Sequence, residues 1–167
     1  MSAPIPFLVV KGDGIGPEIM DAVLFVLKAT GVPIQPKEVN IRDSNGDLCP
    51  EIWKELEETR LMLKGPLVTP QGGGHQSFNV AIRKQLGLFA NVRPVRAFSS
   101  FIPTNHPDMD LVIIRENEED VYAGIEYHQT SDVSHCIKLA TGQGCERIIR
   151  FAFDYARANG RRKVATK

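Results

Sequence analysis

Five polar and basic residues in the middle of the chain have the chemistry to bind a compound that carries several carboxylates. They are Ser77, Asn79, Arg83, Arg93 and Arg115. A planar guanidinium offers paired N–H donors that match a carboxylate, so three arginines can match three carboxylates. Asn79 and Arg83 are four residues apart, which places them on one face if the segment is helical. These residue types predict a small polyanion as the ligand.

The segment before Ser77 favours the same kind of ligand. Residues 72–74 are three successive glycines, which leave the backbone too free for regular structure and predict a loop. We expect a helix over residues 77–86, with Ser77 as its N-cap and Gly87 at its end. The start of a helix offers unpaired N–H groups and the positive end of its dipole to an anion. The alternative is structural: a capping serine, a surface asparagine and a solvated arginine.

The positions of Arg93 and Arg115 strengthen the anion hypothesis. A predicted buried strand over residues 110–115 ends in Arg115, and Arg93 lies in an extended segment. Ligands of open α/β sheets bind beyond the carboxyl ends of the strands. A guanidinium beside apolar residues needs a negative partner. Glu116 and Glu118 are the rivals to a bound anion for that role.

Predicted strands and helices alternate along the chain and would carry these residues. Buried strands are expected over residues 7–10, 61–63 and 110–115, and helices over 17–30, 50–59, 77–86 and 143–158. Residues 122–128 alternate like a strand, with 137–139 as its expected hairpin partner. Short strands alternating with helices predict an α/β sheet. Because residues 161–167 resemble the lead-in to a further strand, we expect a truncated architecture.

The turn after the first predicted strand could be mistaken for a nucleotide-binding loop. Its glycines, Gly12, Gly14 and Gly16, follow GxGxG spacing, whereas a dinucleotide fingerprint needs GxGxxG. The Gly-Lys-Ser/Thr of a P-loop is also absent from this turn. We therefore expect a tight connection between strand and helix, and no phosphate cradle.

Composition and charge limit the class of protein. The chain is 43% hydrophobic and 24% charged, which suits a globular core. Its 20 basic and 20 acidic residues balance, so no overall field draws it to nucleic acid or an anionic membrane. Residues 59–107, however, contain six lysines and arginines and no aspartate or glutamate. Positive charge is thus concentrated in the part of the chain that carries most of the predicted anion site.

Three further features of the sequence indicate the cellular compartment. No apolar run approaches the roughly 18 to 20 residues that span a bilayer, and the start of the chain does not have the pattern of a signal peptide. The three cysteines form no CxxC pair, which argues against a disulfide framework and a zinc site. We expect a soluble protein of the cytoplasm.

Four motifs taken together resemble the isocitrate dehydrogenases, within the metal-dependent β-decarboxylating dehydrogenases. They are GDGIGPE at 12–18, TPxGGGxxSxNVAxR at 69–83, NVRPV at 91–95 and RENxEDxYAGIE at 115–126. The resemblance implies the α/β isocitrate/isopropylmalate dehydrogenase-like fold, which is not a Rossmann fold, with only its N-terminal portion present. Residues 1–88 would be part of the large domain. Residues 89–167 would begin the small domain and include a clasp hairpin used in dimerisation.

The resemblance also implies roles for individual residues. Ser77, Asn79, Arg83, Arg93 and Arg115 would contact the substrate carboxylates, Tyr122 would donate a proton, and Thr69 would lie near the nicotinamide. A phenol that gives and recovers a proton near neutral pH needs a cationic neighbour, for which Arg115 and the family's catalytic lysine are the candidates. The implied cofactors are NADP or NAD and Mg²⁺ or Mn²⁺. The family's catalytic lysine and metal-binding aspartates would lie beyond residue 167, so no metal ligand is expected here, and the isolated chain should be inactive.

The implied reaction is the oxidative decarboxylation of isocitrate to 2-oxoglutarate by a homodimer that binds a small tricarboxylate and neither nucleic acid nor membrane. Isopropylmalate dehydrogenase is a rival, but an isopropyl group calls for apolar contacts where Ser77 and Asn79 offer hydrogen bonds. Homoisocitrate dehydrogenase is harder to exclude. From another class, a non-catalytic regulatory or anion-binding subunit stays open. The choice between NAD and NADP is not decided by these residues.

Overall fold

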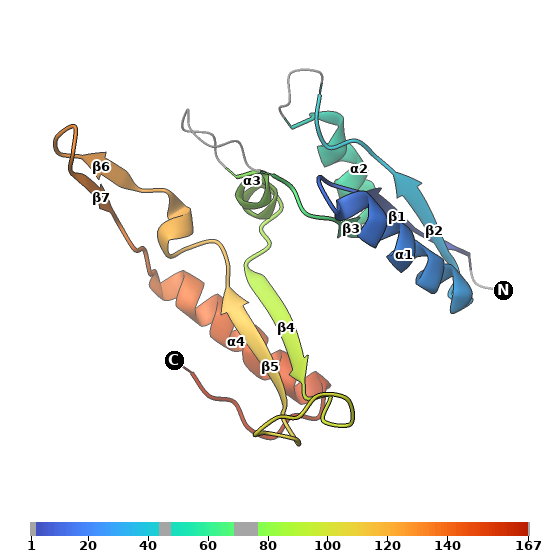
Figure 1. Ribbon diagram of the computed structural model, residues 1–167. Helices are drawn as coiled ribbons and strands as arrows, with labels where there is room; N and C mark the ends of the chain where they lie inside the picture. The colour runs from blue at the N-terminus through green and yellow to red at the C-terminus, as the bar shows by residue number, and fades with distance from the viewer. Residues whose placement is uncertain (1–2, 44–47, 69–76, 167) are drawn as a thin grey trace. The chain divides into compact units, whose positions relative to one another are not determined.

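The chain folds as two compact units, Met1–Asn79 and Val80–Lys167. The computed structural model describes residues 3–43, 48–68 and 77–166 (Figure 1). The boundary between the units falls inside helix α3, Phe78–Gln85. The domain boundary implied by the family resemblance, between residues 88 and 89, stays a prediction.

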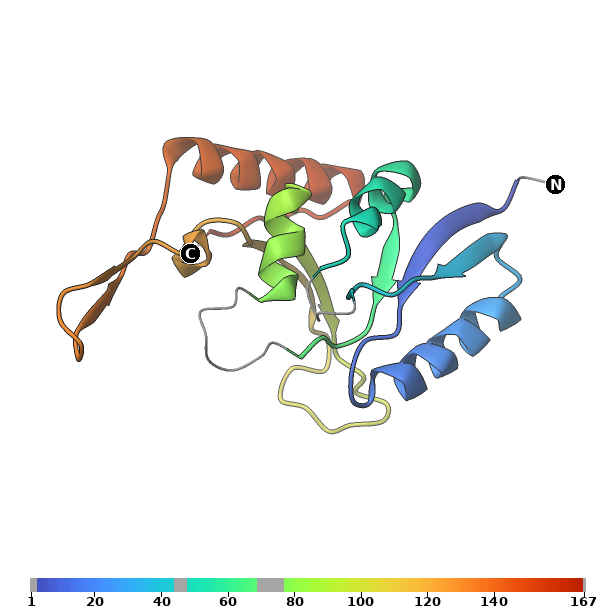
Figure 2. The same cartoon turned by 90° about the horizontal axis from the view of Figure 1, so that it is seen from above.

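The first unit is a three-stranded parallel sheet between two helices. Its strands are β1 (Ile5–Val10), β2 (Ile34–Glu38) and β3 (Met62–Lys64), in the order β2-β1-β3, and its helices are α1 (Gly16–Ala29) and α2 (Glu51–Thr59). Figure 2 shows α1 and α2 on opposite sides of this sheet. Leu8 and Val9 of β1 are fully buried. The predicted apolar run is therefore the central strand, covered on both faces as parallel strands require.

Strand β2 was not predicted from the sequence. Its residues, Ile-Gln-Pro-Lys-Glu, are mostly polar and exposed, because the strand lies at the edge of the sheet. Pro36 is tolerated in such a position, since an edge strand leaves some N–H groups without a ladder partner. Only pairing with β1 makes this segment a strand.

The glycines after β1 permit close packing of the backbone. Gly12 has φ +79°, and a Cβ atom there would lie 2.2 Å from the carbonyl oxygen of Pro66. A Cβ atom at Gly16 would lie 2.3 Å from the carbonyl oxygen of Lys11. Any side chain at either position would collide with backbone. The predicted tight connection is confirmed, and the close approach of Pro66 explains the glycine at position 12.

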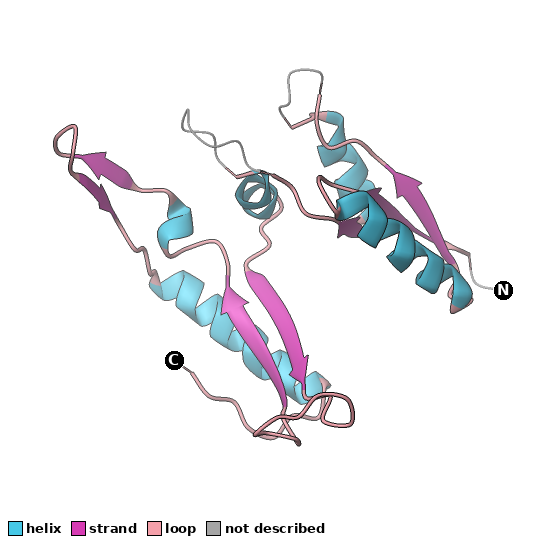
Figure 3. Cartoon of the chain, in the orientation of Figure 1, coloured by secondary structure: helices cyan, strands magenta, loops and turns pink. Residues whose placement is uncertain are grey.

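The second unit combines a two-stranded ribbon, a long helix and a small hairpin (Figure 3). The ribbon pairs β4 (Ala90–Arg96) with β5 (Asp110–Glu116), the helix is α4 (Gly142–Ala158), and the hairpin pairs β6 (Glu126–His128) with β7 (Ser134–Cys136). A short 3₁₀ helix, η1 (Val121–Ala123), lies between β5 and β6. Both pairs of strands are antiparallel.

The strand predicted over 110–115 is confirmed, but its predicted burial is wrong. Val112 and Ile114 line one groove with Ala152 and Ala156 of α4. Side chains alternate between the faces of a strand, so the intervening Ile113 points to the other face and is 50% exposed. Within the described part of this unit, α4 covers one face of the ribbon and leaves the other open.

The strand predicted over 122–128 is wrong in its first half. Asp120 accepts a hydrogen bond from the N–H of Val121, and Gly124 takes a left-handed conformation that ends the 3₁₀ turn. Only Glu126–His128 is extended, and its partner is Ser134–Cys136 instead of 137–139. The N–H of Ile137 nevertheless bonds the carbonyl of Ile125 at 3.0 Å, which continues the pairing. The expected hairpin exists with a shifted register.

The predicted helices are confirmed to within one or two residues. Glycines with positive φ follow three of them: Gly31, Gly87 and Gly160. Thr141 caps α4 by accepting a hydrogen bond from the N–H of Gly144. Residues 161–166 have no regular structure. No helix in the described ranges is long and apolar enough to cross a membrane.

Candidate substrate-anion site

Two of the predicted arginines lie on the same face of the β4–β5 ribbon. In the register of this pair, Asn91 is opposite Arg115 and Arg93 is opposite Ile113. Residues that are opposite share a face, so Arg93 and Arg115 are diagonal neighbours. This is the face that α4 does not cover. Arg93 is steadied by Asn91, whose side-chain oxygen accepts from Nε at 3.3 Å.

The structure also brings Arg115 to Tyr122. One terminal nitrogen of Arg115 donates to the phenolic oxygen at 3.2 Å. The guanidinium carbon lies 5.6 Å from the centre of the tyrosine ring, within the range of a cation–π contact. The cationic neighbour that the sequence suggested for Tyr122 is therefore in place.

The acidic residues that could have neutralised Arg115 have other partners. The carboxylate of Glu116 accepts the N–H groups of Glu118 and Glu119 at 2.8 and 3.0 Å. Glu118 forms an ion pair with Arg147 of α4. Among the described residues, Arg115 makes no ion pair. Its charge is available to an anion from outside the chain.

The acidic loop is fixed to the start of α4. Glu119 accepts hydrogen bonds from the hydroxyl and the N–H of Thr141, the latter at 2.9 Å, and these bonds hold the pKa of its carboxyl below its usual range. A Cβ atom at Gly144 would lie close to the Glu119 carboxylate, so a side chain there would displace that carboxylate from Thr141. Sequence reasoning missed this contact, because no motif links residues so far apart.

Tyr122 itself is held in a constrained turn. Asp120 has φ +59°, which is unfavourable for a residue with a side chain. Its N–H and C=O both bond the backbone of Leu139, at 2.9 and 3.3 Å. On the other side of Tyr122, the carbonyl of Ala123 accepts from Nζ of Lys84 in α3 at 3.1 Å. The proton-donor candidate is therefore anchored on both sides, and Lys84 is a supporting residue that the sequence did not reveal.

The remaining predicted residues belong to α3 or precede it. Ser77 directly precedes the helix, and Asn79 and Arg83 are four residues apart within it. All three are partly buried. Thr69 lies outside the described residues. That Ser77 and Asn79 share one ligand with the arginines of the second unit stays a prediction.

The divalent metal that the family resemblance implies does not fit the described residues. Nowhere in residues 3–43, 48–68 and 77–166 do three or more His, Cys, Asp or Glu side chains gather closely enough to hold a metal ion. What these residues offer is an anion site with a tyrosine beside it.

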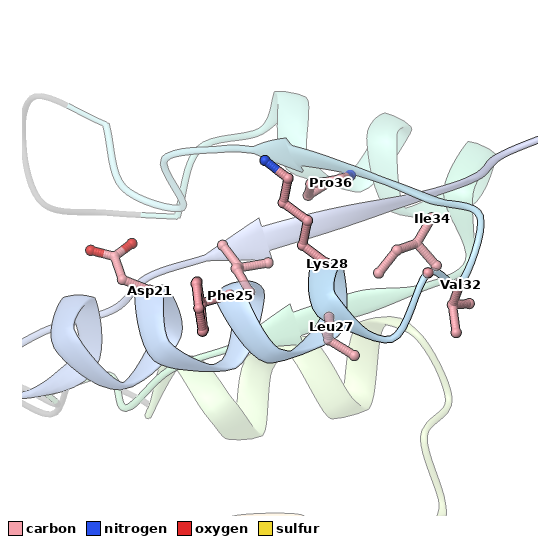
Figure 4. Close-up of a pocket in the computed structure, with 9 residues that line it drawn as sticks. Asp21, Phe25, Leu27, Lys28, Val32, Ile34 and Pro36 are labelled. Carbon is pink, nitrogen blue, oxygen red and sulfur yellow. The ribbon is translucent and has the colours of Figure 1, made fainter.

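A separate groove between α1 and β2 has the wrong chemistry for a polyanion. Phe25, Leu27, Val32 and Ile34 line it, and Figure 4 shows these apolar side chains around the space. None of the predicted site residues borders it. The groove is therefore not the candidate substrate site.

The fold and the arginine–tyrosine pair fit one class of α/β dehydrogenase. The model of the isocitrate/isopropylmalate dehydrogenase family matches residues 7–167, so the chain belongs to that family. The resemblance inferred from the four motifs is thereby confirmed.

Individual relatives agree with this assignment. The chain is 47% identical to an isocitrate dehydrogenase [NADP] of Rickettsia bellii, over 95% of this chain and 34% of that protein. It is 43% identical to subunit 2 of the mitochondrial isocitrate dehydrogenase [NAD] of Saccharomyces cerevisiae, over 93% of this chain and 43% of that one. The chain thus spans between about a third and a half of the length of these relatives.

A solved structure supports the predicted fold. The isocitrate dehydrogenase of Methylococcus capsulatus superposes with a TM-score of 0.84 at 41% identity, covering 94% of this chain and 49% of that one. The predicted isocitrate/isopropylmalate dehydrogenase-like α/β fold is confirmed.

Proposed function

We propose that the protein carrying this chain is an isocitrate dehydrogenase, which oxidatively decarboxylates isocitrate to 2-oxoglutarate with NADP or NAD and Mg²⁺ or Mn²⁺. The observation that carries the proposal is the pairing of Arg115 with Tyr122, beside Arg93, while the neighbouring carboxylates are bonded elsewhere. The identity to isocitrate dehydrogenases of both coenzyme types supports it.

The arginines would bind and orient the substrate. Arg93 and Arg115 share an open face of the ribbon, where two adjacent guanidiniums repel each other unless an anion lies between them. A tricarboxylate satisfies this requirement, and each guanidinium can hold one carboxylate through two parallel hydrogen bonds. Arg83, Ser77 and Asn79 would supply further donors. Holding the substrate at several points offsets the entropy of orientation before the chemical steps.

Tyr122 would act as the general acid. Loss of CO₂ from a β-keto acid leaves an electron-rich carbon that must gain a proton. The phenol of Tyr122 can donate that proton, and the guanidinium of Arg115 at 3.2 Å stabilises the phenolate until it is protonated again. The same arginine would thus hold the substrate and assist the acid.

The coenzyme contact, the oligomeric state and the cellular compartment that we propose are those implied by the family resemblance. Thr69 would lie near the nicotinamide, the protein would work as a homodimer in the cytoplasm, and the β6–β7 hairpin would be the clasp between its subunits. Binding the metal and accepting the hydride are not assigned to any described residue. These parts of the proposal rest on the resemblance alone.

Steady-state turnover by the complete protein that carries this chain tests the proposal. We expect isocitrate to be converted in the presence of Mg²⁺ or Mn²⁺ with NADP or NAD, and homoisocitrate and 3-isopropylmalate to react at least tenfold less efficiently. A higher kcat/KM for either alternative substrate would reassign the specificity. Binding of isocitrate without turnover would favour a regulatory subunit.

A further inference from the structure

A bidentate ion pair in the first unit links two segments that no motif connects. The two terminal nitrogens of Arg42 donate to the two carboxylate oxygens of Asp13, at 2.9 and 2.7 Å. Asp13 lies in the turn between β1 and α1, and Arg42 lies in the segment after β2. Their side chains are only 28% and 27% exposed. Such a pair is strongly directional, because both hydrogen bonds fix the plane of the guanidinium.

Asp13 and Arg42 each form a hydrogen bond with the backbone of Val68. Asp13 accepts the N–H of Val68 at 2.7 Å, and Arg42 donates to the carbonyl of Val68 at 2.9 Å. The N–H of Val68 is the largest cause that lowers the pKa of the Asp13 carboxyl, and the Arg42 guanidinium lowers it further, while desolvation opposes both. Val68 immediately precedes the 69–83 motif.

The same guanidinium contacts the other end of that segment. The central carbon of Arg42 lies 4.9 Å from the ring centre of Phe78, a cation–π contact. Phe78 is the first residue of α3 and follows Ser77 directly. Arg42 thus contacts both Val68 and Phe78, which flank residues 69–77 in the sequence. Asp13 holds Arg42 in position through their ion pair.

Stability alone gives a weak account of this arrangement. The core cluster of the first unit is apolar, formed by Phe7, Val9 and Met20. A partly buried ion pair gains little net free energy, since desolvation offsets most of the attraction. Within the described residues, Nε of Arg42 is buried without a hydrogen-bond partner, which adds to that cost. What the pair does distinctively is connect the backbone of Val68 to the ring of Phe78, which directly follows Ser77 in the sequence.

We propose that Asp13 and Arg42 are positioning residues for substrate binding: their ion pair fixes Val68 and Phe78, and through them the orientation of Ser77. This inference rests on the proposed function, since it takes Ser77 to be a substrate contact. Neither Asp13 nor Arg42 touches the substrate in this proposal.

Two conservative variants of the complete protein test it. Arg42→Lys keeps the charge but loses the two terminal guanidinium nitrogens that bond Asp13 and Val68. Asp13→Asn keeps the size of the side chain but loses its charge. We expect each to raise the KM for isocitrate about tenfold while kcat changes less than threefold, as loss of binding orientation requires. The double variant should cost no more than the worse single one, because both changes break one unit.

Glu55→Gln is the matched control, since it breaks another ion pair of the same unit, between Lys37 of β2 and Glu55 of α2 at 2.9 Å. It should leave the KM unchanged. Equal KM values for Arg42→Lys and the unaltered protein, or an equal rise in Glu55→Gln, would overturn the positioning role and leave Asp13–Arg42 a structural link.

A measurement independent of turnover separates this inference from the proposed function. Hydrogen–deuterium exchange should become at least several-fold faster in the peptide that covers residues 77–85 of Arg42→Lys, with the β1 peptide unchanged. Unchanged exchange in both peptides overturns the positioning role even if the protein turns over isocitrate. Faster exchange in a protein that does not convert isocitrate would support the positioning role and reject the proposed reaction.

Discussion

Arg42 in the first unit and Arg115 in the second differ in whether the chain supplies a carboxylate to their guanidinium groups. Arg42 has a carboxylate of its own chain, Asp13, bonded to both terminal nitrogens. Arg115 donates to a neutral phenol, and its nearest acidic neighbours in the sequence are bonded to backbone N–H groups and to Arg147. An arginine that the fold neutralises can hold neighbouring segments of the chain in place. An arginine that the fold leaves without an anion, on an open strand face, is suited to a ligand.

The largest effect is expected at the proton donor beside Arg115. Tyr122→Phe removes the phenolic oxygen and should lower kcat by about 100-fold or more, since a positioned general acid contributes about 10² to 10⁴. The dissociation constant for isocitrate should change little. Tyr155→Phe, at a tyrosine of α4 that stacks on Phe151, is the control and should leave kcat unaltered. Stopped-flow and steady-state kinetics on the complete protein measure both values, and a full-rate Tyr122→Phe would exclude the assigned role.

A carboxylate introduced at position 77 should occupy the proposed anion site, much as the Asp13 carboxylate already pairs with Arg42. Ser77→Asp places a carboxylate where the substrate is proposed to bind, so isocitrate affinity should fall by about 100-fold or more through charge repulsion. Phosphorylation of Ser77 should act in the same way. Ser77→Ala separates loss of the hydroxyl from gain of charge. If calorimetry finds unaltered affinity for Ser77→Asp, then Ser77 is only a helix cap.

The paired N–H donors of the Arg115 guanidinium can be tested separately from its charge. Arg115→Lys keeps the charge but loses bidentate geometry, which should weaken isocitrate binding by about 1 to 3 kcal/mol with little change in the thermal midpoint. Arg96→Lys, on the opposite face of β4 and paired with Asp110 at 3.4 Å, should affect neither value strongly. A large fall in thermal midpoint with unchanged affinity would make Arg115 structural.

The smallest expected effect concerns the acid stability of the Asp13–Arg42 pair. Because the folded state lowers the pKa of Asp13, the stabilisation is fully present above the ordinary carboxyl pKa of about 4. It is lost as the pH falls through the lower folded value. Asp13→Asn should therefore flatten the loss of thermal midpoint as the pH falls below about 4. Identical acid profiles for Asp13→Asn and the unaltered protein would show that the pair contributes no pH-dependent stability.

Most of the local structure and the candidate ligand residues could be predicted from the amino-acid sequence alone. Apolar spacing and glycine stops located the helices, since helix contacts are made within a few residues of the same segment. The arginines and Tyr122 could be selected because guanidinium and phenol chemistry is a property of the residue type. Strand β2 could not be found, as its mostly polar residues become a strand only at the edge beside β1.

Which of these residues come into contact depends on the tertiary fold. The register that sets Asn91 opposite Arg115 determines that Arg93 and Arg115 share a face, and a shift of one residue would separate them. The turn from Asp120 to Gly124 replaces an expected strand and brings Tyr122 to Arg115. Asp13 and Arg42 meet across 29 residues of chain. These contacts depend on pairings between distant segments, and the pattern of one segment carries no information about its partner's register.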